Sequence, residues 1–147
     1  MAPVEPRISY VVGRLDRALR RKLGEALRPH GLTVRQYTTL SVLRARSGLS
    51  NAQLARRSLM TPQSMNEVLA ALVALGLVRR TPDEAHGRVI RTELTAAGAA
   101  RLEACDDAVD VLEQEMLAGL DARERERLLA ELRRCARALG AGFPEDD

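Results

Sequence analysis

Cysteine, histidine and aromatic residues are scarce in this 147-residue sequence. Two cysteines and two histidines are too few and too scattered for a disulfide framework or a zinc site. Two tyrosines, one phenylalanine and no tryptophan argue against single-stranded nucleic acid binding, which depends on stacking against aromatic rings. We therefore expect no metal and no cofactor.

Long apolar runs are also missing. The longest nearly apolar stretch, "VLAALVALGLV" at 68–78, falls well short of the roughly 20 residues needed to cross a bilayer. The first 20 residues have no apolar core followed by a small-residue cleavage site. These features predict a cytoplasmic protein without a membrane segment.

The sequence shows no pattern typical of an enzyme. We find no nucleophile paired with a base, no paired carboxylates in an apolar setting and no glycine loop for a phosphate. We expect no catalytic residue, and solvation on one helix face accounts for the main acidic group: Asp106, Asp107, Asp110, Glu113 and Glu115.

Charge is distributed unevenly along the chain. Residues 1–32 hold seven basic and three acidic side chains (+4), residues 33–92 hold nine and three (+6), and residues 93–147 hold seven and fourteen (−7). The basic excess in the first two segments favours a polyanionic partner, with ordinary solvated helix faces as the alternative.

Apolar residues at helical spacing, together with cap and stop signals, predict six helices. A threonine cap and a proline at the first helical position mark the fourth helix, at Thr61 and Pro62. We expect helices at about 8–27, 33–46, from 50 onward, 62–75, 95–117 and 121–140. Hydroxyl or carboxylate caps followed three residues later by Gln or Glu mark three of the starts: Thr33 with Gln36, Ser50 with Gln53, and Asp121 with Glu124.

The segment "LVRRTPDEAHGRVIRTEL" at 77–94 has two β-prone arms, 77–81 and 88–94, around a turn-rich centre. It predicts a β-hairpin after the fourth helix. The fold class is therefore mainly α with a small β-hairpin wing, which is the arrangement of a winged helix-turn-helix lobe.

The fourth helix is the candidate DNA-reading element. The major groove is about 12 Å wide and admits one helix, whose first turns read base edges. Met65, Val68, Leu69 and Leu72 are expected to hold this helix to the core. The opposite face offers amides suited to adenine, hydroxyls suited to phosphates or bases, and one carboxylate that either accepts from cytosine or stays in solvent. The candidate residues are Thr61, Gln63, Ser64, Asn66 and Glu67.

Arginines flank this helix on both sides, and we expect them to contact phosphates. One at the hairpin tip is expected to enter the minor groove. They are Arg56, Arg57, Arg79, Arg80, Arg88 and Arg91.

Three segments together resemble the MarR family of transcriptional regulators: "GLTVRQYTTLSVL", "SNAQLARRSLMTPQSMNEVLAALVALGLVRR" and "GRVIRTELTAAG". Their order and spacing match from about residue 8 to residue 139. The resemblance implies a cytoplasmic homodimer that binds double-stranded DNA at pseudo-palindromic operators, usually represses, and often releases DNA when a small aromatic or acidic effector binds. It further implies an N-terminal dimerisation helix (1–32), a winged lobe (33–94), and C-terminal dimerisation helices with an acidic tail (95–147), within one compact domain.

Two positions depart from the family pattern. The wing reads His86, Gly87, Arg88, so the acid expected two residues before Arg88 is missing or replaced by Asp83 or Glu84. Ala70 stands where the family frequently has an aspartate.

Several residues have competing interpretations. Tyr37 and His30 are the candidate ligand-binding residues, although Tyr37 also fits a core position and His30 a capping position. His86 is expected to contact the DNA backbone. We expect Cys105 and Cys135 to be buried, inert thiols, which argues against redox sensing.

A dimeric helical module that binds a protein partner without DNA is the main alternative function. For the dimer itself, we hypothesise that the arginine-rich first helix pairs with the acidic last helices.

Overall fold

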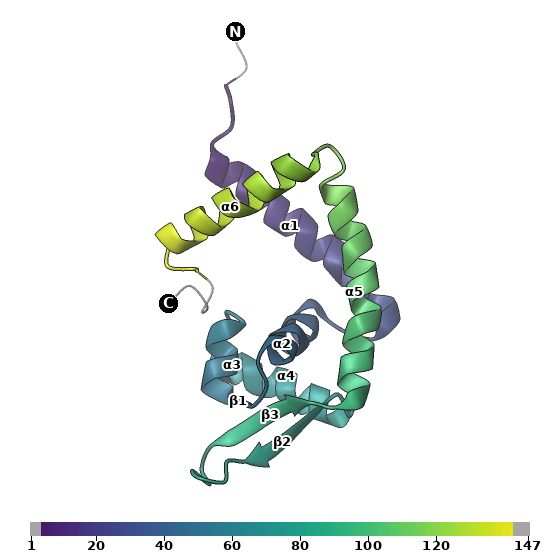
Figure 1. The fold of residues 1–147 in the computed structure, drawn as a ribbon, viewed down its shortest axis with the longest axis vertical. Helices are drawn as coiled ribbons and strands as arrows, with labels where there is room; N and C mark the ends of the chain where they lie inside the picture. Colours follow the sequence, from purple (N-terminus) through teal and green to yellow (C-terminus); the bar gives the residue numbers. More distant parts are fainter. Residues whose placement is uncertain (1–3, 143–147) are drawn as a thin grey trace.

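The structure, a computed structural model, describes residues 4–142 (Figure 1). Within this range it contains six α-helices, one 3-10 helix and three strands. In chain order they are α1 (Ile8–Leu27), η1 (Arg28–His30), α2 (Val34–Ala45), β1 (Leu49–Ser50), α3 (Asn51–Arg57), α4 (Pro62–Ala74), β2 (Val78–Pro82), β3 (Ile90–Leu94), α5 (Ala96–Met116) and α6 (Ala122–Ala138). The predicted helix and hairpin boundaries, where given, agree with these within two residues.

Local caps start the helices as predicted. At α2 the Thr33 hydroxyl accepts from the Gln36 backbone N–H at 3.2 Å, and the Gln36 side chain accepts from the Thr33 backbone N–H at 2.9 Å. The same reciprocal pair starts α3 and α6. Each pair satisfies two backbone donors that a helix start leaves open.

The sheet has three antiparallel strands in the order β1-β3-β2. The predicted hairpin is confirmed, with Val78 opposite Leu94 and Pro82 opposite Ile90. Strand β1 was not predicted, because two residues are too short to show an alternating pattern. It pairs with the other edge of β3, with Leu49 opposite Thr92.

The apolar core lies beneath α2, α3, α4 and the sheet, and it also takes side chains from α1 and α5. Leu40, Leu54 and Leu69 from the winged lobe are fully buried, as are Leu27 of α1 and Leu102 of α5. The fold class is confirmed as mainly α with a small sheet.

The two cysteines differ. Cys105 is buried in this core, as predicted. The prediction for Cys135 was wrong, because it is exposed on α6 in the single chain. No helix described here is long and apolar enough to span a bilayer.

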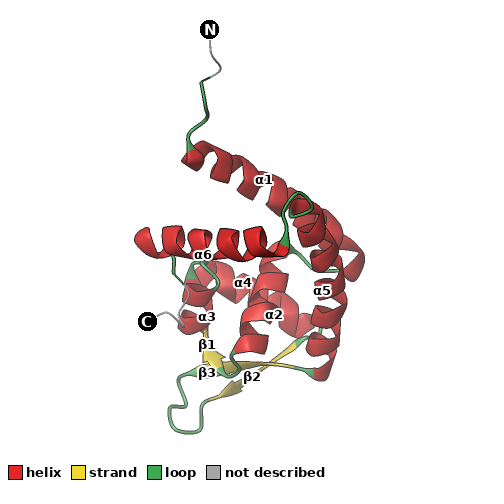
Figure 2. Cartoon of the chain, turned by 45° about the horizontal axis from the view of Figure 1, so that its top comes forward, coloured by secondary structure: helices red, strands yellow, loops and turns green. Residues whose placement is uncertain are grey.

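Helix α5 connects two regions of the molecule. In Figure 1 it runs along one side from the sheet toward α6, while α1 and α6 lie at the end away from the strands. Figure 2, in a turned view, again places the strands at one end and the start of α1 at the other. The winged lobe is therefore presented at one end of a helical arm.

Candidate DNA-binding surface

The first turn of α4 is held by its cap. Thr61 Oγ1 accepts from the Ser64 backbone N–H at 3.1 Å and donates to Ser64 Oγ at 3.0 Å, so the Thr61 hydroxyl caps the helix beside its predicted contact. Pro62 occupies the first helical position, where no backbone N–H is needed. The cap fixes where the exposed side chains of this turn project.

The two faces of α4 divide as predicted. The apolar stripe is buried in the core: Met65, Val68, Leu69 and Leu72. The opposite face is exposed and uncharged apart from one carboxylate: Gln63, Asn66, Glu67 and Ala70. Gln63 and Asn66 therefore face solvent from the start of a helix whose other side is anchored.

The turn between α3 and α4 places α3 against α4. Leu59 in this turn has a φ of 54°, a left-handed conformation that costs energy for a branched side chain. Arg56, at the end of α3, is exposed, whereas Arg57 is partly buried.

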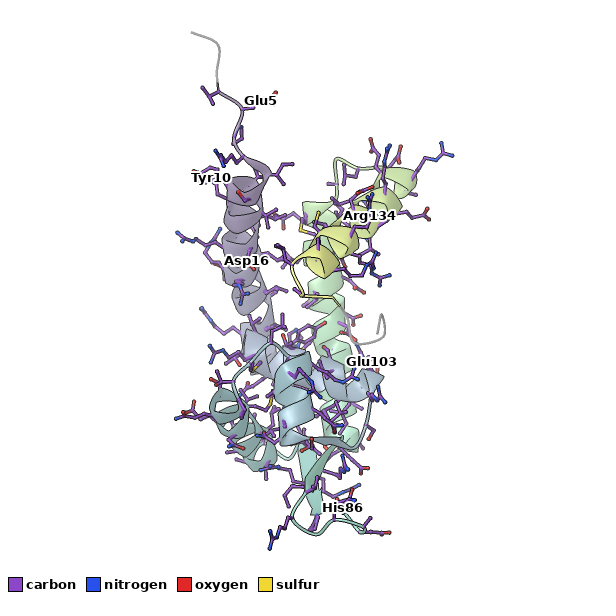
Figure 3. All side chains as sticks on the ribbon, turned by 90° about the vertical axis from the view of Figure 1, so that its left-hand side faces the viewer. Glu5, Tyr10, Asp16, His86, Glu103 and Arg134 are labelled. Atoms are coloured by element: carbon purple, nitrogen blue, oxygen red, sulfur yellow. The ribbon has the colours of Figure 1, made fainter. Side chains whose placement is uncertain are left out.

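Exposed guanidinium groups come from the elements that border α4. Arg56 on α3, Arg80 on β2 and Arg88 near the wing tip have no ion pair with any residue between 4 and 142, whereas Arg79 pairs with Glu93 across the hairpin at 3.3 Å. His86 lies at the far end of the wing (Figure 3). An unpaired, exposed guanidinium is free to meet a phosphate.

Arg91 differs from the other predicted arginines because it holds the wing together. Its Nε lies 2.7 Å from Asp83 Oδ2, and its Nη1 donates to the Gln53 side chain at 3.3 Å. Its side chain is only 32% exposed. The suggestion that Asp83 orients Arg88 was wrong, since Asp83 orients Arg91 instead, and Glu84 is exposed.

Asp83 also builds the tip of the wing. Its Oδ1 accepts from the backbone N–H groups of Ala85 and His86 at 2.8 and 3.0 Å. The Arg91 guanidinium, followed by these two backbone donors, lowers the pKa of Asp83 to about 2. The carboxylate therefore stays charged at any pH near neutrality.

We expect Asp83→Asn to destabilise the protein in a pH-dependent way. Because the folded pKa is about 2 against an ordinary 3.8, the stabilisation is fully present above about pH 4 and is lost as the pH falls toward 2. The gap in free energy of unfolding between wild type and variant, measured by urea denaturation from pH 2 to 7, should narrow as the pH falls from 4 to 2. Glu84→Gln should show no such trend, and a gap of the same size at pH 2 as at pH 7 would contradict the assignment.

The two ligand-binding candidates lie in different places. The Tyr37 hydroxyl donates to Asp106 Oδ1 at 2.8 Å, and burial, followed by this hydrogen bond, raises its pKa to about 12. The carbonyl of His30 accepts from Arg101 at 3.0 Å. Asp106 and Arg101 are five residues apart, about 140° around α5, so the structure does not bring Tyr37 and His30 together.

The expectation that solvation alone accounts for the acidic group on α5 was wrong for Asp106. This residue is not simply solvated, because it accepts from Tyr37 and forms an ion pair with Arg44 of α2. No sequence pattern predicts this cluster, since Asp106 lies 62 residues from Arg44 and 69 residues from Tyr37.

A helix-turn-helix followed by a hairpin wing, with the second helix presenting polar side chains outward, defines a winged helix-turn-helix protein. A model described as "MarR family" matches residues 30–89. The chain is 37% identical over 128 residues to the HTH-type transcriptional repressor Rv2887 of Mycobacterium tuberculosis, covering 85% of this chain and 92% of that protein. The chain belongs to the MarR family of transcriptional regulators.

Solved structures agree with this assignment. The crystal structure of Rv2887 in complex with DNA has a TM-score of 0.75 and 30% identity, covering 89% of this chain and 98% of that one. Its complex with salicylic acid has a TM-score of 0.71 and 36% identity, covering 90% and 99%.

Proposed function

We propose that this protein is a cytoplasmic repressor that binds double-stranded DNA in a sequence-specific way as a homodimer. It acts by binding rather than by catalysis. The observation that carries the proposal is the exposed amide face of Gln63 and Asn66 at the capped start of α4, bordered by unpaired guanidinium groups.

The chemistry of this surface suits a duplex. An α-helix about 10–12 Å across fits a major groove about 12 Å wide, with its first turns nearest the base edges. An amide presents one donor and one acceptor, which matches adenine. Arg56, Arg80 and Arg88 then supply charge for phosphates on either side. Arg57, Arg79 and Arg91 are partly buried or paired, so we assign them weaker contacts.

A second copy of the chain is the proposed partner of α1 and α6. The start of α1 exposes Ile8 (81%), Val11 and Val12, and α6 exposes Leu129 and Leu132. Apolar faces of this extent on two helices at the end away from the strands are typical of an interface. On this basis we retain 1–32 and 95–147 as dimerisation segments around the lobe at 33–94, while the predicted acidic tail, at 144–147, lies outside the described residues.

Within the single chain, several charged residues of α1 already have partners, and contacts between two chains stay a prediction. Lys22 pairs with Glu115 of α5, but Arg20 pairs with Asp16 and Arg21 pairs with Glu25 within α1 itself. We therefore assign dimerisation mainly to apolar burial, with a modest salt dependence.

A small effector is part of the proposal because a related repressor was crystallised with salicylic acid. We infer that this chain responds to a small aromatic acid, with Tyr37 and His30 as candidate contacts at two separate places rather than in one pocket. Isothermal titration with salicylate, alone and against the protein–DNA complex, tests this response.

The salt dependence of duplex binding tests DNA recognition. A dimer that contacts roughly eight phosphates should give a slope near −7 in a plot of log K against log salt concentration. Arg88→Ala removes one contact from each protomer, so the slope should become shallower by about 2 while all duplexes weaken about equally.

Arg134→Ala provides the matched control, because Arg134 lies on α6 and pairs with Glu131. It should leave the slope unchanged. If the wild type shows a flat slope, or binds no duplex at low salt, the protein-binding helical module becomes the better interpretation.

A further inference from the structure

One charged cluster joins the winged lobe to α5. Its members are Tyr37 and Arg44 of α2 and Asp106 of α5, which we name the Asp106 cluster. The Tyr37 hydroxyl donates to Asp106 Oδ1 at 2.8 Å, Arg44 Nη1 pairs with Oδ2, and Arg44 Nη2 lies 3.4 Å from Oδ1. Both carboxylate oxygens are therefore held by groups on the same helix of the lobe.

The ionisation states keep this cluster intact near neutral pH. The Arg44 guanidinium, opposed by burial and aided by Tyr37, lowers the pKa of Asp106. Tyr37, with its raised pKa, remains a protonated donor. Every hydrogen bond in the cluster thus has a charged acceptor, which makes each one stronger than a neutral pair.

The lobe is attached to α5 at a second point, nearer the start of the helix. Thr95 Oγ1 donates to the Gly76 carbonyl at 2.6 Å. One turn on, Gly98 packs so closely on Leu77 that a Cβ there would lie 2.0 Å from the Leu77 carbonyl oxygen. Gly98 and the Asp106 cluster are eight residues apart, about 12 Å along the helix.

Between these two points α5 contacts the lobe at 33–94 through apolar side chains, and the one polar contact, from Arg101 to the His30 carbonyl, goes to a residue that precedes the lobe. Leu102 and Cys105 are fully buried in the core, but apolar burial is non-directional and tolerates small rotations. Hydrogen bonds require a defined direction. Farther along, Leu112 and Glu115 of α5 face α1 rather than the lobe. Among residues 4–142, the Asp106 cluster is therefore the directional contact between the lobe and α5 that lies farthest from the start of α5.

A small movement at this cluster has a large effect at the DNA. If the cluster is lost, the lobe can shift by about 1 Å at Asp106 while it stays attached at Gly98, about 12 Å away. Such a shift rotates the lobe about Gly98 by about 5°. Asn66 lies 11 residues before Leu77, about 17 Å along α4 from this pivot, so the rotation displaces it by about 1.4 Å. The two protomers together change the separation by about 3 Å, close to the rise of one base pair, about 3.4 Å.

We propose that the Asp106 cluster positions the winged lobe on α5 and thereby fixes the half-site spacing that the dimer accepts. Asp106, Tyr37 and Arg44 are positioning residues, which act through α4 and do not touch DNA. This inference rests on the proposed binding of DNA by a dimer. Partly exposed ion pairs add little net stability, so orientation is the larger contribution of this one.

The test compares three kinds of duplex: the palindrome selected by the wild-type dimer from a random pool, the same palindrome with one base pair inserted or deleted at its centre, and a duplex with a single half-site. Asp106→Ala should bind the selected palindrome about 2- to 30-fold more weakly than wild type. It should bind the single half-site within about twofold of wild type, and it should discriminate less between the three spacings.

Two further variants separate positioning from folding. Tyr37→Phe removes only one hydroxyl. It should also weaken binding of the palindrome and reduce discrimination between the spacings, with smaller fold-changes than Asp106→Ala. Glu115→Ala removes the α5 carboxylate that pairs with Lys22 of α1, so it changes a comparable ion pair without touching the lobe and should keep wild-type spacing preference.

The outcomes are distinct. If wild type binds no duplex, the proposed function fails. If wild type binds but Asp106→Ala and Tyr37→Phe lose palindrome and half-site equally, with a lower melting temperature, the cluster is only structural and this inference is wrong. It is also wrong if both variants keep the wild-type spacing preference.

Discussion

Asn66→Ala is expected to weaken operator binding by about 30-fold to 10⁴-fold. A well-placed amide contributes about 1–3 kcal/mol of discrimination at one base, and a homodimer loses that contact at both half-sites. Folding should be unaffected, because Asn66 is exposed while its neighbour Met65 carries the packing. Electrophoretic mobility shifts or fluorescence anisotropy on selected and scrambled duplexes would measure the change.

The loss should be confined to the selected sequence. Binding of Asn66→Ala to scrambled duplex should stay within about twofold of wild type, and Gln63→Ala should alter preference at a different base. Asp107→Ala, an exposed position on α5, is the control and should not weaken binding. Equal loss on both duplexes would show that Asn66 contacts the backbone rather than a base.

Among glycine-to-alanine substitutions in the described chain, Gly98→Ala is expected to lower the free energy of unfolding the most. Alanine normally stabilises a helix relative to glycine by about 1 kcal/mol, but here its Cβ would meet the Leu77 carbonyl oxygen at 2.0 Å. Overpacking of this kind costs about 3 kcal/mol, which corresponds to a fall in melting temperature of about 6–12 °C. Thermal denaturation at fixed chain concentration measures it.

Gly24→Ala in α1 is the matched substitution. Apart from its two chain neighbours and the nearby backbone of α1, no atom lies within 4 Å of the added Cβ. This variant should therefore melt at or above the wild-type temperature. If Gly98→Ala were as stable as Gly24→Ala, α5 would not pack on Leu77 as described.

Most of the fold was predictable because its signals are local. Thr33 with Gln36, and Ser50 with Gln53, mark helix starts within four residues, and the structure shows both pairs. The buried stripe of α4 and the hairpin likewise follow from short-range periodicity.

The features that were missed depend on contacts between distant residues. Strand β1 exists because Leu49 and Ser50 reach the free edge of β3, some 40 residues later. The role of Asp83 depends on which arginine the hairpin register places beside it, and that arginine is Arg91. Asp106 has a partner only because α2 and α5 pack together. A single sequence gives no signal for any of these.

The exposed surface of the candidate site was predictable from the sequence, but the ion pairs and hydrogen bonds among its residues were not. The exposure of Gln63 and Asn66 follows from the same periodicity that buries Met65. Which arginines are free could not be read from spacing, because pairing with Glu93 or Asp83 depends on strand register.

The uncovered apolar residues of α1 and α6 bear on how the protein responds to its own abundance. If two chains must meet before either can occupy an operator, occupancy at low copy number rises with the square of the amount synthesised. A twofold change in expression would then alter promoter occupancy about fourfold, giving a sharper dose response than a monomeric binder has.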